Sequence, residues 1–150
     1  MTWSLEIPIY NCSVAFLIES NAEEIKEFYA KNKKKLSKEG YECIIKDIED
    51  YEETGGATYS EGVDYLVYIR NINEEDHMDH ELYHLTNVIL MDRGIAHTRE
   101  DEPFAYLNGW LHKQWRQIKK DYLKEMKDAK ARKSGSGSTE QCGKSEEAQR

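Results

Sequence analysis

The chain has 150 residues, 39% of them hydrophobic and 33% charged, and a formal net charge of −8. This length predicts one globular domain, and no run of ~18 apolar residues is present, so we expect no membrane span. The negative charge argues against a nucleic-acid partner, since that affinity comes largely from Lys and Arg that release counterions. Three cysteines without CxxC spacing indicate a reducing compartment, and the first residues do not resemble a signal peptide. We therefore expect a cytoplasmic protein.

The first half of the chain predicts strands around one helix. Ile, Val, Phe and Tyr are frequent over 5–19, which indicates one or two strands, and apolar residues at helical spacing then predict a helix over about 22–39. A weak alternation predicts another strand over 41–48. After the turn at Gly55-Gly56, residues 57–60 and 63–70 are expected to pair as a hairpin.

The second half predicts two helices. The first runs over about 74–93, with Asn73 as N-cap and Gly94 as the glycine that ends it. The second begins near Glu102-Pro103, and its apolar residues recur at steps of three and four: Phe104, Leu107, Leu111, Trp115, Ile118, Tyr122 and Met126. Residues 1–133 are thus expected to form an α+β domain, in which three helices pack on a small, mostly antiparallel sheet. Residues 134–150 are expected to be a flexible polar tail.

Basic residues gather at 31–38 and 113–133, with Asp and Glu interleaved in the second group. Solvated helix faces explain both groups better than a nucleic-acid contact does.

Three histidines on the first of these two helices, His77, His80 and His84, stand at i, i+3 and i+7 and share one face. Within them, His80-Glu81-Leu82-Tyr83-His84 is an HExxH pattern. Residues four apart on a helix project side by side, so His80 and His84 can bind one zinc ion. Glu81 then acts as the general base toward a water whose pKa the zinc lowers. The alternative is a surface helix whose histidines are only solvated.

A hydrolytic zinc site usually has a third protein ligand and an open position for water. The extended HExxHxxGxxH pattern is absent, because Asn87 and Leu90 stand at the glycine and third-histidine positions. Glu102, at the start of the next helix, is the first candidate and His97 the second, and Glu100 and Asp101 on the connecting loop are further alternatives. Glu102 can equally serve as a negative charge at a helix start.

These residues resemble the zincin-like metallopeptidase family encoded by tailed bacteriophages. The resemblance covers roughly 55–118 and rests on Gly55 to Tyr59, His80 to His84, Gly94-Ile95, and the segment from Glu102 to Trp110. It implies a glutamate zincin with Glu102 as third ligand, although Pro103 stands where another helix former is expected. It also implies a substrate strand in Gly56, Ala57, Thr58, Tyr59 and Ser60, whose edge accepts a peptide by β-addition.

Three functions remain open at this point. The first is a zinc-dependent hydrolase acting on a peptide or protein, in the host cytoplasm or the virion, in which Tyr106 either helps the site or packs in the core. The second is a non-catalytic phage structural or accessory protein that retains a zincin-like fold and assembles with phage proteins. A weaker third is an inhibitor of a host protein.

Overall fold

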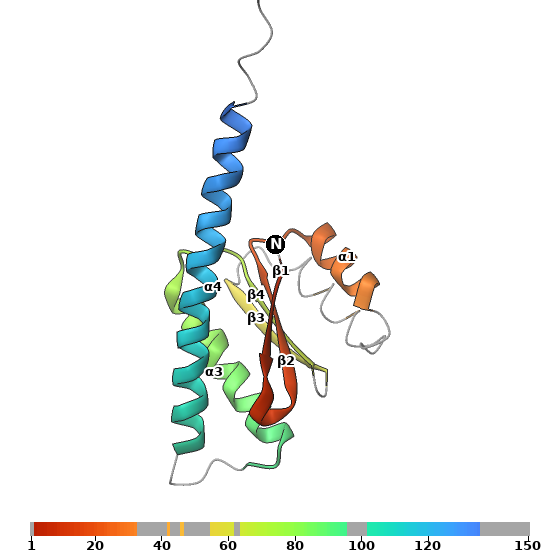
Figure 1. The fold of residues 1–150 in the computed structure, drawn as a ribbon. Coiled ribbons are helices and arrows are strands. Elements are labelled where there is room, and N and C mark those ends of the chain that lie inside the picture. Colours follow the sequence, from red (N-terminus) through yellow and green to blue (C-terminus); the bar gives the residue numbers. More distant parts are fainter. Residues whose placement is uncertain are drawn as a thin grey trace, which may run out of the picture. The chain divides into compact units, whose positions relative to one another are not determined.

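The computed structural model describes residues 2–32, 42, 46, 55–61, 64–95 and 102–135. Its element order confirms the α+β class (Figure 1). The elements are β1 (Thr2–Ile7), η1 (Pro8–Tyr10), β2 (Cys12–Ile18), α1 (Ala22–Asn32), β3 (Gly56–Glu61), β4 (Asp64–Ile69), α3 (Glu75–Asp92) and α4 (Glu102–Gly135).

The four strands form one sheet in the order β1-β2-β4-β3. Two antiparallel hairpins, β1 with β2 and β3 with β4, are joined by parallel pairing of β2 with β4. The expected hairpin is confirmed, whereas the parallel pair makes the sheet mixed. In this order β3 is the last strand of the described sheet, next to β4.

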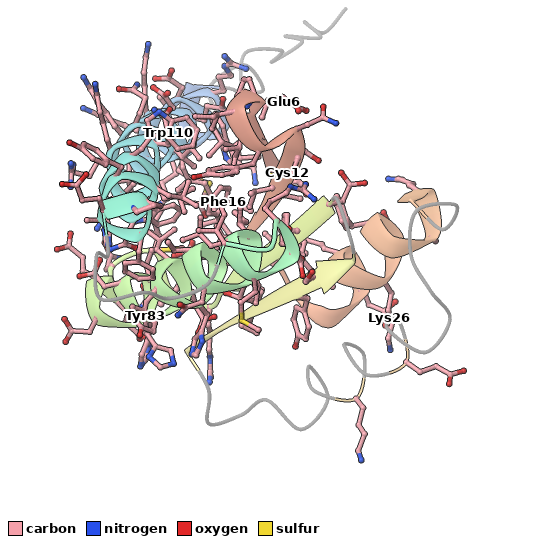
Figure 2. The ribbon with its side chains drawn as sticks, turned by 90° about the horizontal axis from the view of Figure 1, so that it is seen from below. Glu6, Cys12, Phe16, Lys26, Tyr83 and Trp110 are labelled. Carbon is pink, nitrogen blue, oxygen red and sulfur yellow. The ribbon has the colours of Figure 1, made fainter. Side chains whose placement is uncertain are left out.

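Helices cover both faces of the sheet, as Figure 1 shows for α1 on one side and α3 on the other. On the first face, Ile25 of α1 packs with Leu17 and Leu66. On the second face Phe16 is fully buried, and its ring centroid lies 5.8 Å from that of Trp115 in α4. Figure 2 shows Phe16 between the helices and the strands. Each such side chain contributes about 1.5–3 kcal/mol when it leaves water.

The chain divides into two compact units, residues 1–115 and 116–150, and the boundary falls inside α4. The sheet, α1, α3 and the first turns of α4 belong to the first unit. No helix in the described ranges has the length and apolar content that a membrane crossing requires.

Of the two elements predicted between β2 and β3, the helix is confirmed in part and the strand is wrong where it is described. The helix expected over 22–39 is confirmed as α1 up to 32, and the rest lies outside the described residues. The strand expected over 41–48 is wrong where it is described, because residues 42 and 46 are helical. Glu42 and Lys46 stand four apart, a spacing that favours a helix and outweighs a weak alternation.

The second predicted helix is confirmed as α3, but its N-cap is not Asn73. Glu74 occupies that position without a side-chain cap bond. Asn71 organises the turn instead, because its side chain accepts from the Asn73 N–H and donates to Glu74, both at 3.0 Å. Gly94 ends the helix as predicted, with φ of 69° in the left-handed region that favours glycine.

The last predicted helix begins at Glu102 as expected and extends to Gly135, so it takes in the first residues of the expected tail. The remainder of the tail lies outside the described residues.

Candidate metal centre

The two predicted imidazole ligands meet on the exposed side of α3. The Nε2 atoms of His80 and His84 lie 2.9 Å apart, and the ring centroids are separated by 4.4 Å. Two nitrogens about 2.0–2.1 Å from one tetrahedral zinc lie about 3.3 Å apart. A small opening of the pair therefore suffices for both to ligate one ion, and this part of the donor set fits zinc.

Glu81 lies at the border between this imidazole face and the core. Its residue is only 6% exposed, and Thr58 on β3 approaches it from the sheet. The Thr58 Oγ1 atom donates to Glu81 Oε2 at 2.7 Å and also lies 3.1 Å from the Glu81 carbonyl oxygen. A hydroxyl has one hydrogen, and the carboxylate is the stronger acceptor. Thr58 thus fixes one oxygen of the predicted base.

The two glycines before Thr58 allow β3 to lie directly on α3. A Cβ atom at Gly56 would come within 2.8 Å of Glu81 Cγ and 3.1 Å of the Tyr68 carbonyl oxygen. A Cβ at Gly55 would collide with the ring of His77. Side chains at either position would force strand and helix apart, so the glycines set the distance between β3 and the candidate site.

The predicted third ligand is not brought to the histidine pair. Among the described residues no three His, Cys, Asp or Glu side chains gather around a common point. The side of α4 that contacts α3 carries Phe104, with its ring 5.2 Å from Tyr83, and Asn108, which accepts from Thr86 at 3.1 Å. Glu102 precedes Phe104 by two positions, or about 200° around the helix, and is exposed. The other candidate, His97, lies outside the described residues.

Tyr106 does not pack in the core, so that expectation is wrong. Its side chain is 75% exposed, and it lines a cavity of about 500 Å³ together with residues of β1, η1 and α4. The lining is Ile7, Pro8, Ile9, Tyr10, Tyr106, Leu107 and Trp110. Figure 2 shows Trp110 and Tyr83 on opposite sides of the α3–α4 pair, so this cavity is separate from the side of α3 near the histidines.

The other predicted substrate residue, Ala57, faces away from α3. It pairs with Tyr68, whose side chain packs against the cluster under α1. Side chains alternate along a strand, so Gly56 and Thr58 face Glu81 while Ala57 faces the opposite side of the sheet. Only the backbone of Ala57 is available to a substrate beside β3.

One polar anchor was not predicted. Asp92 Oδ2 accepts from Ser60 Oγ and from Tyr65 Oη, both at 2.9 Å, and so ties the end of α3 to β3 and β4. Burial and the Asp92 carboxylate raise the pKa of Tyr65 above its usual range. The pairing of Ser60 with Tyr65 could have indicated this site, but only once the hairpin register was known.

The chain was compared with protein-family models, with curated proteins and with solved structures, and no match was found.

Proposed function

We propose that this chain is a zinc-dependent hydrolase of the zincin type, with His80 and His84 as metal ligands and Glu81 as the general base. The observation that carries the proposal is the histidine pair, with Nε2 atoms 2.9 Å apart, next to a nearly buried carboxylate on the same helix. The bond from Thr58 on β3 to Glu81 supports the proposal further, because a helix whose histidines are only solvated needs no such fixed carboxylate beside them.

The residues divide the chemistry between them. Zinc, when bound, supplies a Lewis acid that lowers the pKa of a water and polarises a carbonyl group. Glu81 would take up the proton that this water releases. Thr58 holds Glu81 Oε2 at 2.7 Å, and no hydrogen bond within the described part of the chain occupies Oε1. That second oxygen is the proton acceptor we assign.

The substrate class that this arrangement supports is a peptide in extended conformation. In the order of the described sheet β3 is the terminal strand, and an extended peptide can bind a sheet by β-addition at its terminal strand. The same strand contacts Glu81 through Gly56 and Thr58. A peptide bound along β3 would therefore lie against the strand that positions the base.

The resemblance to phage zincins supports Glu102 as third ligand, with His97 as the alternative. Because Glu102 lies on the side of α4 away from the Phe104 contact, ligation would require its first turn to rotate or unwind.

Metal analysis and turnover test the proposal on the full chain. Purified protein supplied with zinc is expected to hold about one ion per chain, and His80→Ala is expected to lose it. His112→Ala is the matched control, because His112 lies on α4 beside Asp79 at 3.3 Å and outside the pair. Glu81→Gln is expected to keep the zinc and abolish cleavage of denatured casein.

Two results would contradict the proposal. Less than about 0.2 zinc per chain, unchanged by His80→Ala, would favour the non-catalytic phage protein with a zincin-like fold. Equal casein cleavage by the parent and by Glu81→Gln would remove Glu81 from the mechanism.

A further inference from the structure

The second part of α4 carries a narrow row of cations, which we call the basic stripe: Arg116, Lys120, Lys124 and Lys127. Their spacing of four, four and three positions places them within an arc of about 80°, over roughly 16 Å of helix. Arg116, Lys120, Lys124 and Lys127 are all exposed.

The opposite side of the same helix is apolar. Ile118 and Tyr122 are 8% and 4% exposed and stand about half a turn from the stripe. The acidic residues Asp121, Glu125 and Asp128 occupy a third arc between the two. The stripe is therefore a separate surface that Asp and Glu do not interrupt.

The basic stripe differs from an ordinary solvated helix face. On α1, Lys26 and Lys31 form ion pairs with Glu23 and Glu27 at 3.8 and 3.5 Å. In the described part of the chain the four stripe cations form no ion pair with a carboxylate. Arg116 with Lys120, and Lys120 with Lys124, are like charges at i and i+4, which cost the helix about 0.2–0.5 kcal/mol per pair. The arrangement favours an external anionic partner at the expense of helix stability.

The charge of the whole chain is divided in the same way. Residues 1–115 hold 11 Lys and Arg against 23 Asp and Glu, a net charge of −12, whereas residues 116–150 hold 10 against 6, a net charge of +4. The two units therefore carry net charges of opposite sign, and the positive unit of one chain attracts the negative unit of another.

We propose that the basic stripe docks on the acidic first unit of a second copy of this chain. A nucleic acid or an anionic membrane carries phosphates over a surface much longer than the stripe, and the net charge of −12 on the first unit opposes its approach. A membrane-bound helix also needs an exposed apolar face, whereas Ile118 and Tyr122 are buried. A second copy offers 23 Asp and Glu in its first unit to the four cations of the stripe. This inference does not depend on the metal site.

Sedimentation of the full chain tests the inference. At about 0.05 M salt we expect an average molar mass that exceeds that of one chain and increases with protein concentration. At about 1 M salt, where charges are screened within ~3 Å, we expect the molar mass of a monomer. Replacing the four stripe residues by Gln is expected to weaken self-association by about tenfold or more. The matched control replaces Lys119, Lys130, Arg132 and Lys133 by Gln. It removes four cations from the same helix outside the stripe, and we expect it to associate as the parent does.

Three results would overturn the inference. The parent chain could stay monomeric at low salt, or the control could lose association as fully as the stripe variant, which would implicate net charge alone. In the third, a short DNA duplex or phosphatidylserine vesicles would bind the stripe while the chain alone stays monomeric. Circular dichroism of both variants checks that helix content is kept.

Discussion

Replacing Thr58 by Val would remove the hydroxyl that holds Glu81 while keeping nearly the same side-chain shape. The lost hydrogen bond is 2.7 Å long and ends on a carboxylate whose residue is 6% exposed. Hydrogen bonds to charged groups contribute about 1.5–3 kcal/mol. Thr58 is itself half-buried, so water replaces part of the bond. We therefore expect the free energy of unfolding to fall by about 2 kcal/mol.

Urea unfolding at pH 7, followed by circular dichroism, measures this change, provided that the dependence on urea keeps the same slope. Thr58→Ser is the control, because it keeps the donor and loses one methyl group, which costs about 0.8 kcal/mol. A double-mutant cycle of Thr58→Val with Glu81→Gln isolates the interaction between the two side chains, and we expect their effects on the free energy of unfolding to be non-additive. The reasoning is refuted if Thr58→Val stays within about 0.5 kcal/mol of the parent, or if it costs no more than Thr58→Ser.

Three further changes test neighbouring contacts. Gly56→Ala should lower the free energy of unfolding in the same urea assay by about 1–3 kcal/mol, since its Cβ would lie 2.8 Å from Glu81 Cγ. Gly109→Ala is the control: its Cβ meets nothing within 4 Å, so the substitution should be neutral or stabilising by about 0.5–1 kcal/mol. Asp92→Asn should cost about 1–2 kcal/mol, because the acceptor shared by Ser60 and Tyr65 loses its charge; an unchanged unfolding midpoint would contradict that. Because the pKa of Tyr65 is raised in the folded state, this residue contributes stability that is present below the unfolded pKa of about 10 and is lost as pH rises above it. The free energy of unfolding should therefore fall more steeply between pH 10 and 12 for the parent than for Tyr65→Phe. Equal slopes would rule out this contribution.

The elements that the sequence predicted well are those whose pattern is complete within one segment. The strands around Phe16 and the hairpin of β3 and β4 follow local composition, and α3 is bounded by Gly94. The parallel pairing of β2 with β4 was not predicted, because it joins segments that are far apart in the chain and depends on how the crossover packs.

The candidate site divides in the same way. His80 and His84 could be paired from spacing alone, since one helix fixes their separation. The bond from Thr58 to Glu81 and the anchor at Asp92 depend on the register of β3 against α3, which no local pattern contains. The predicted third ligand is the hardest part to derive from sequence, because its position depends on the path of the chain between α3 and α4.

The close contact of Gly56 with Glu81 has a consequence for recognising distant relatives of this chain. An HExxH pattern alone is short and arises by chance, but here it is spatially tied to a G-x-T segment formed by Gly56 and Thr58, which precedes it in the chain. The hairpin turn between β3 and β4 can change length without altering that contact. A search for the two short patterns together, with a variable gap, would select chains able to build the same strand-to-helix contact.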